Sequence, residues 1–258
     1  MSKPRIVAIA NQKGGVGKTT TAINLGAALA ELGHSVVIID LDSQGNASTG
    51  LGIPAEERVL TSFDLLATDE TLEACLVSTE VENLRLVPST SDLASADVQL
   101  STTPGRTQLL RNKIADIQGI DFILIDCPPA LGLLTLNGMV AAHSILVPLQ
   151  AEFYALEGLS QLLTTVREVR QSANPDLRIE GILMTMSDNR NNLSQQVEAD
   201  ARNTLSDLVY KTVIPRNVRL SEAPSHAMPV LRYDTTSKGS NAYRSLAQEF
   251  LQRQLVTA

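Results

Sequence analysis

The sequence predicts an α/β fold, a doubly wound and mostly parallel sheet with helices on both faces. Short and almost purely apolar segments recur along the chain, as expected for strands that are buried on both sides. Helical segments, with apolar residues three and four positions apart, alternate with these strands. No long Pro-, Gly- or Ser-rich linker and no internal repeat divides the 258 residues. We therefore expect a single domain that spans residues 1–258.

The chain opens with a strand, a glycine-rich loop, a helix and a second strand. Residues 5–10 (RIVAIA) are apolar and predict the first strand. Residues 18–33 place Ile23 and Ala27 on one helical face and predict a helix. Residues 35–40 (SVVIID) predict the second strand. If the two strands are parallel, the helix between them should make a right-handed crossover.

Strands and helices continue to alternate over the remainder of the chain. The stretch 43–83 is the least regular, and we expect it to form an excursion on the surface. The further predicted strands are 84–89, 121–126, 144–149, 178–186 and 208–215, and the further predicted helices are 106–117, 133–142, 155–171, 193–206 and 240–256.

Composition argues against several classes of protein. The formal net charge of −7 argues against a generally basic nucleic-acid-binding protein, although residues 151–258 are neutral and leave room for a local basic face. No apolar run reaches membrane-spanning length, and the N-terminus does not read as a signal peptide. Cys75 and Cys127 lack zinc-site spacing. We expect a cytoplasmic protein that does not bind membranes.

Residues 11–20 (NQKGGVGKTT) carry the strongest functional signal. They follow a buried strand and open a helix, which is the setting of a phosphate-binding loop. Glycines let backbone N–H groups turn toward anionic oxygens, and the dipole of the following helix favours negative charge. The predicted nucleotide-binding residues of this loop are Lys13, Gly14, Gly15, Val16, Gly17, Lys18, Thr19 and Thr20.

Two predicted strands bring carboxylates to the same edge of the sheet. One strand ends with Asp40 and is followed by Asp42, and another ends with Asp126. Ligands of such sheets bind at the carboxyl ends of the strands, where a carboxylate holds Mg²⁺ directly or through water. We expect Lys18 to reach the β- and γ-phosphates. The predicted metal site comprises Thr19, Asp40 and Asp126.

The loop departs from the usual G-x-x-x-x-G-K-[ST] pattern. Gln12 stands at the position of the first glycine, and Lys13 adds a second lysine. Lys13 could reach the nucleotide of another subunit and act like an arginine finger supplied in trans, which is worth ~10³-fold or more in rate. It could also be an exposed lysine that merely raises the local potential. The residues alone leave both alternatives open.

Several segments resemble the ParA/MinD ATPases, whose phosphate loop carries the deviant Walker A motif. The likeness covers nearly the entire chain, with Ser43 at a position where the family usually has Pro. The C-terminal likeness is to Soj-type ParA chromosome-partitioning proteins. The segments that carry the resemblance are 13–20 (KGGVGKTT), 40–48 (DLDSQGNAS), 124–132 (LIDCPPALG), 214–225 (IPRNVRLSEAPS) and 230–243 (VLRYDTTSKGSNAY).

The resemblance implies a P-loop ATPase that uses ATP and Mg²⁺ and forms a homodimer in the ATP state. It implies that Lys13 crosses the dimer interface and that Asp42 positions or activates the attacking water. The implied catalytic residues are thus Lys13, Lys18 and Asp42. Gly14 would lie where the partner approaches closely, so a side chain there should block dimerisation. Pro215 and Asn217 are similar to residues near the adenine.

The resemblance also implies that the ATP dimer binds double-stranded DNA non-specifically on the nucleoid. Arg190 and Arg219 match the DNA-contacting positions, with solvated side chains or a role in the nucleotide pocket as the alternatives. A ParB-like partner would stimulate slow hydrolysis and couple it to chromosome segregation.

Other functions share the same site. The main alternative is a ParA-like ATPase that positions a plasmid or a chemoreceptor cluster. A MinD-like membrane-cycling ATPase would need an amphipathic tail after the last helix. The positions of Cys75 and Cys127 do not suit a cluster-bridging iron–sulfur reductase. A scaffold that never hydrolyses ATP would not need both Lys13 and Asp42.

Overall fold

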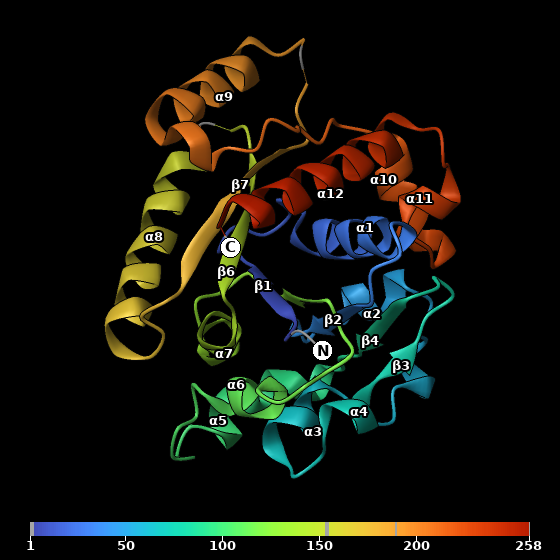
Figure 1. Cartoon of the computed structure of the whole chain (residues 1–258), viewed down its shortest axis with the longest axis vertical. Helices are drawn as coiled ribbons and strands as arrows, with labels where there is room; N and C mark the ends of the chain where they lie inside the picture. Colours follow the sequence, from blue (N-terminus) through green and yellow to red (C-terminus); the bar gives the residue numbers. More distant parts are fainter. Residues whose placement is uncertain (1–2, 153–154, 189, 258) are drawn as a thin grey trace.

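A computed structural model describes residues 3–152, 155–188 and 190–257 (Figure 1). Seven strands form one sheet in the order β3-β4-β2-β5-β1-β6-β7, and only β3 runs antiparallel to its neighbour. The predicted fold class is therefore confirmed. The strands are β1 (Arg5–Ile9), β2 (Val36–Asp40), β3 (Val77–Ser78), β4 (Leu84–Val87), β5 (Phe122–Asp126), β6 (Ser144–Gln150) and β7 (Arg178–Thr185).

Helices cover both faces of the sheet (Figure 1). One buried cluster joins Ile6 and Ala8 of β1 to α3–α9, and a second joins Val7 and Ile9 to α1, α11 and α12. Alternate residues of a strand thus enter opposite cores. The α-helices are α1 (Lys18–Glu31), α2 (Asn46–Gly50), α3 (Ser62–Ala67), α4 (Leu72–Cys75), α5 (Ala96–Gln99), α6 (Leu109–Ile114), α7 (Leu133–Ala141), α8 (Ala155–Ser172), α9 (Asn192–Leu205), α10 (Val218–Glu222), α11 (Val230–Tyr233) and α12 (Lys238–Thr257).

None of the helices in the described ranges combines the length and the apolar character that crossing a bilayer requires.

The centre of the sheet brings the predicted carboxylates together. Strand β5 lies between β2 and β1, with Asp126 in register with Asp40 on one side and Ile9 on the other. Because the three strands are parallel, their carboxyl ends meet at one edge. The glycine-rich loop leaves β1 at this same edge and leads into α1. The sheet order therefore sets the loop beside two buried aspartates.

The predicted strand 208–215 is wrong. A 3₁₀ turn (Ser206–Leu208) overlaps the start of this segment, and the described residues after it form only isolated bridges, from Val209 to Ile182 of β7 and from Pro215 to Ser187 just after β7. The backbone N–H groups of Lys211 and Thr212 instead donate to the Glu249 carboxylate of α12, each at 2.8 Å. Two adjacent donors are thus diverted from β7, so a continuous strand cannot form.

The predicted helix 106–117 is too long, since α6 begins only at Leu109 and ends at Ile114. Asn137 of α7 binds the preceding backbone through its side chain: its amide group donates to the Arg106 carbonyl at 2.8 Å and accepts from the Leu110 N–H at 3.2 Å. These bonds hold residues 106–110 against α7. Side-chain competition of this kind is invisible in the periodicity of the segment.

The stretch 43–83 contains short elements that the sequence did not predict. Helices α2, α3 and α4 and the 3₁₀ turn Ala55–Glu57 follow one another there, and β3 adds an antiparallel edge strand. Thr61 caps α3 in a reciprocal capping box with Asp64. Helices this short give too few turns for an apolar period to be read.

Candidate nucleotide-binding site

The loop between β1 and α1 is shaped as an anion cradle. Gly15 and Gly17 have left-handed φ angles of 73° and 90°, which glycine adopts without steric cost. Gly17 is also the N-cap of α1, and no side chain caps this helix or adds an acidic group to its first turn. The first N–H groups of α1 therefore remain available to an anion.

Two distant strands hold this loop in place. The Asn11 side-chain amide donates to the Pro148 carbonyl of β6 at 2.8 Å, and its oxygen accepts from the Lys13 N–H at 3.0 Å. On β7, the Thr185 hydroxyl donates to the Val16 carbonyl at 2.8 Å. Sequence reasoning missed Asn11 and Thr185, because partners separated by 137 and 169 residues leave no local signal.

Lys18 is enclosed at the base of the cradle. Only 7% of the residue is exposed, and its ammonium donates to the Lys13 carbonyl at 3.0 Å. Burial lowers the pKa of Lys18, and the charges of Asp126, Cys127 and Asp42 oppose that change. A buried ammonium that is held by a loop carbonyl is well placed to meet a bound phosphate.

Asp40 fixes the loop that follows β2. It is fully buried, and one oxygen accepts from the Ser48 N–H at 3.0 Å and the Ser48 hydroxyl at 2.7 Å. Its other oxygen accepts from the Asp42 N–H at 3.1 Å. Burial raises the pKa of Asp40 to about 6, against the effect of these bonds. Sequence reasoning missed Ser48, although the hydroxyl lies within the quoted segment 40–48.

Asp126 is the unsatisfied group of the site. It is 1% exposed, and neither carboxylate oxygen has a hydrogen-bond partner among the described residues. Burial raises the pKa of Asp126 well above its ordinary value, and the charge of Asp40 raises it further. The Thr19 side chain and the charge of Lys18 oppose this shift, although Thr19 does not reach hydrogen-bond geometry.

The arrangement fits a hydrated divalent cation. Two orphaned oxygens of Asp126 lie near the Thr19 side chain, at the entrance to the phosphate cradle. Mg²⁺ prefers oxygen ligands and usually combines one or two protein groups with waters and substrate phosphates. Among the described residues no group of three His, Cys, Asp or Glu could hold a metal by itself. Oxygens of Asp126 and Thr19 would therefore supply part of the coordination of Mg²⁺, and phosphate oxygens and waters would supply the rest.

Asp42 and Lys13 differ in exposure, since Asp42 is buried and Lys13 reaches solvent. Asp42 is 8% exposed, and one of its oxygens accepts from the Gln44 N–H at 3.0 Å. The Lys13 ammonium forms an ion pair with Glu152, just after β6, and the two side chains are 40% and 47% exposed. The Lys13 side chain is thus partly in solvent and is paired at the surface with Glu152. Apart from Gly14 and its two chain neighbours, no described residue has an atom within 4 Å of a Cβ placed on Gly14.

A cavity of about 730 Å³ lies beyond the carboxyl end of β7. Its lining includes Ser187, two residues after Thr185, and Pro215, one of the predicted adenine contacts. Asn217 is not among the lining residues; its side-chain oxygen accepts from the Arg219 N–H at 2.8 Å and caps α10. The structure thus places Pro215, but not Asn217, at a space of nucleoside size.

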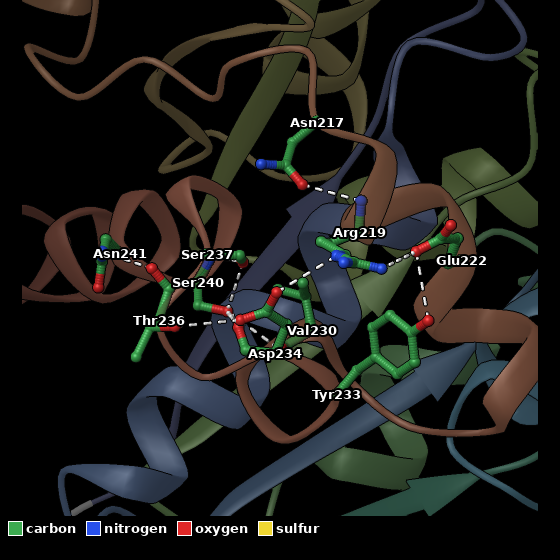
Figure 2. Close-up of polar contacts among 10 residues, drawn as sticks. All are labelled: Asn217, Arg219, Glu222, Val230, Tyr233, Asp234, Thr236, Ser237, Ser240 and Asn241. Atoms are coloured by element: carbon green, nitrogen blue, oxygen red, sulfur yellow. Dashed lines mark hydrogen bonds and ion pairs between the residues drawn. The ribbon is translucent and has the colours of Figure 1, made fainter.

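The two predicted DNA-binding arginines are both paired with carboxylates. Arg190 is 90% exposed and makes a two-point contact with Asp188 at 3.0 and 2.9 Å. Arg219 lies between Glu222 at 2.8 Å and Asp234 at 3.3 Å, and Figure 2 shows its guanidinium group bridging the two. Arg190 lines the 730 Å³ cavity and Arg219 does not, so the two belong to separate clusters.

Comparison with known proteins identifies the family. A family model described as an AAA domain matches residues 4–179. The chain is 51% identical over 246 residues to the sporulation initiation inhibitor protein Soj of Bacillus subtilis, across 95% of this chain and 97% of that protein. It is also 51% identical over 253 residues to the chromosome partitioning protein ParA of Caulobacter vibrioides, across 97% and 95% of the two chains. The chain belongs to the Soj/ParA family of ATPases.

A solved structure with a bound nucleotide and magnesium shares the fold of this chain. A crystal structure named cobyrinic acid a,c-diamide synthase, from Mycobacterium smegmatis and with bound ADP and magnesium, matches with a TM-score of 0.87. It is 38% identical, and the match covers 99% of this chain and 97% of that chain. The predicted resemblance to the ParA/MinD ATPases is confirmed, and a Soj/ParA ATPase is expected to combine a phosphate loop with a magnesium site.

Replacing Asp126 by Asn should stabilise the protein without nucleotide at neutral pH. Because the folded pKa of Asp126 lies above its unfolded value, the native wild type takes up this proton first and gains stability as pH falls from 8 toward 4. Asp126→Asn has no such proton. Its advantage in the free energy of unfolding should be at least about 1 kcal/mol at pH 8 and should shrink toward pH 4.

Urea denaturation at several pH values measures this difference. Asp176→Asn, on an exposed aspartate, is the control and should stay close to the wild type throughout. If Asp126→Asn is less stable than the wild type at pH 8, the prediction is wrong. The native protein would then stabilise the Asp126 charge without a bound cation.

Proposed function

We propose that this Soj/ParA ATPase is a nucleotide-driven switch that dimerises with ATP, binds DNA non-specifically and segregates chromosomes together with a ParB-like partner. One observation carries the proposal. The uncapped start of α1 lies beside an enclosed lysine and an orphaned aspartate, while a second lysine extends outward from the same loop. The inner groups suit a nucleotide in the same chain. The outer lysine suits a second subunit.

The inner groups would bind ATP with Mg²⁺. Lys18 would exchange its bond to the Lys13 carbonyl for the β- and γ-phosphates. Thr19 and Asp126 would hold Mg²⁺, which when bound neutralises phosphate charge and orients the γ-phosphate. Asp40 would position the loop of Asp42 rather than contact the metal directly, because both of its oxygens already accept hydrogen bonds.

The outer groups would act on the γ-phosphate. Lys13 would leave Glu152 and reach the nucleotide of the partner subunit, where a positive charge stabilises the transition state. Asp42 would position the attacking water from the same chain. After hydrolysis the phosphate contacts of Lys13 are lost, so the dimer separates. We infer slow turnover, accelerated by the partner, because a switch must persist long enough to mark its location.

The DNA-binding face would include Arg190 and Arg219 from both subunits. Dimerisation doubles the number of these cations, so an acidic chain can bind phosphates once two copies combine. We propose that the protein acts on the nucleoid as a single ATPase domain over residues 1–258. The alternative cargoes, a plasmid or a chemoreceptor cluster, would use the same chemistry.

Identity ranks the competing activities. The Mycobacterium smegmatis protein, whose name refers to diamide synthesis, is 38% identical to this chain. The Soj and ParA proteins reported above are each 51% identical to it. A MinD-like cycle is supported less, since the MinD structure from Pyrococcus furiosus is 26% identical. Partitioning is therefore the function that the relatives support best.

Glu152→Gln should favour the ATP dimer. It removes the carboxylate that pairs with Lys13 within one chain, so less free energy opposes the crossing of Lys13 to the partner. Both side chains are well exposed, which limits the gain in dimer affinity to about fivefold or less. Sedimentation with a non-hydrolysable ATP analogue measures it. Glu168→Gln on α8 removes the same charge elsewhere and should change nothing; a weaker Glu152→Gln dimer would contradict the proposed competition.

Gly14→Val should separate nucleotide binding from dimerisation. The side chain meets open space in one chain, so we expect nucleotide affinity within about threefold of the wild type. In a closed dimer it would occupy the approach of the second subunit. Equilibrium binding of a fluorescent ATP analogue and gel filtration test the two halves. A Gly14→Val protein that still dimerises places the interface elsewhere.

The DNA-binding proposal can be tested in both directions. Arg190→Glu and Arg219→Glu together should weaken DNA binding by the ATP dimer at least about tenfold at low salt and flatten its salt dependence. Asp188→Asn frees Arg190 from its carboxylate and should tighten binding about two- to fivefold. Arg170→Glu, an exposed arginine on α8, is the control. If the Arg190/Arg219 variant and the control bind DNA with equal affinity, the DNA-binding face lies elsewhere on the protein.

A further inference from the structure

The end of the sheet remote from the phosphate loop holds a second cavity, of about 880 Å³. Arg5 and Arg178, the first residues of β1 and β7, line it together with the C-terminal part of α12 and the segment 206–211. We call this cavity the basal pocket. It lies at the opposite ends of the two strands that carry and tether the phosphate loop, so nucleotide chemistry does not account for it.

The basal pocket is cationic within an acidic protein. Its lining has five arginine or lysine side chains and three carboxylates, a balance of +2, while the whole chain carries −7. Clustered charge of this sign concentrates anions in a concave site. The cationic residues are Arg5, Arg178, Arg202, Lys211 and Arg253.

Two of the three carboxylates are already satisfied by the protein. Glu180 pairs with Arg5 at 3.0 Å and accepts from the Ser144 hydroxyl at 2.6 Å. Glu249 pairs with Arg253 at 3.0 Å and also accepts the two N–H groups of the segment that fails to form a strand. The third, Asp207, lies at the exposed rim. The inner acids are therefore not available to neutralise further cations.

Two cations of the lining are left over. Arg178 and Lys211 are exposed, and neither forms an ion pair within the described ranges of the chain. Arg202 differs, because Glu198 pairs with it at 2.9 Å. An exposed arginine and lysine on the same cavity offer charge-assisted hydrogen bonds to an incoming oxygen anion.

Two buried donors without acceptors lie at this end of the sheet. Tyr210 is 0% exposed and is not itself a lining residue, and its hydroxyl has no hydrogen-bond partner in the described structure. The Arg253 guanidinium stacks over the Tyr210 ring at 3.9 Å, and the Arg5 Nε is likewise buried and unpartnered. Burial raises the pKa of Tyr210, so the hydroxyl stays a neutral donor. Unmet buried donors are costly, so this end of the sheet has donors that the described acceptors of the chain do not satisfy.

We propose that the basal pocket binds a small molecule with two anionic oxygen groups, either a dicarboxylate or a phosphate ester. Arg178 and Lys211, the two exposed cations of the lining without an ion-pair partner in the described ranges, bind the anionic groups. The volume is in the range of small-molecule sites.

Calorimetry on the full chain saturated with ADP and Mg²⁺, which occupies the phosphate loop, tests the proposal. Succinate and glucose 6-phosphate are the two probes, and they distinguish a carboxylate source from a phosphate source. At least one should bind with a Kd below about 1 mM. Arg178→Gln with Lys211→Gln should weaken that binding roughly tenfold or more. Arg167→Gln with Arg170→Gln, exposed arginines of α8 outside the pocket, should leave it unchanged.

The fold should tolerate Arg178→Gln with Lys211→Gln, because both side chains are exposed and neither forms an ion pair in the described ranges. The unfolding midpoint of this double variant should match that of the wild type. The proposal is overturned if neither probe binds or if both double variants behave alike. It is also overturned if Arg178→Gln with Lys211→Gln loses DNA binding while retaining the probe.

Discussion

The site depends on a carboxylate that folding leaves uncompensated. Strand β5 occupies the centre of the sheet, so its last residue, Asp126, is removed from water by strands on both sides. No described donor satisfies it, and Asp40 adds a second buried carboxylate one strand away. Such an arrangement costs stability in the empty protein. A cation with bound triphosphate would remove that cost, and the free energy recovered would contribute to the affinity for the ligand.

The neighbouring strands give this charge a fixed setting. The phosphate loop is held from β6 through Asn11 and from β7 through Thr185, so it does not rely on its own short-range contacts. Lys18 is enclosed, whereas the Lys13 side chain is 40% exposed and pairs with Glu152. Two lysines five residues apart therefore differ in freedom. The enclosed one suits a permanent role, and the exposed one suits a contact that forms and breaks.

The sequence predicted the central strands and the inner site because their signals are local. Strands buried on both faces read as apolar runs, and the loop, the helix and the terminal aspartates follow them directly. The segment 208–215 was misread because Glu249, far along the chain, takes two of its N–H groups. Thr185 was missed for the same reason of distance. The pairing of Arg219 with Asp234 likewise depends on how α10 and α11 pack, which periodicity cannot reveal.

Sedimentation velocity of the wild-type chain tests the central claim most directly, in three conditions: a non-hydrolysable ATP analogue with Mg²⁺, the same analogue with a chelator, and ADP with Mg²⁺. The proposed mechanism requires a cation that compensates the charge of Asp126 and a γ-phosphate that Lys13 contacts from the other subunit. It therefore predicts a dimer in the first condition and monomers in the other two. The same sedimentation coefficient in all three would contradict the account.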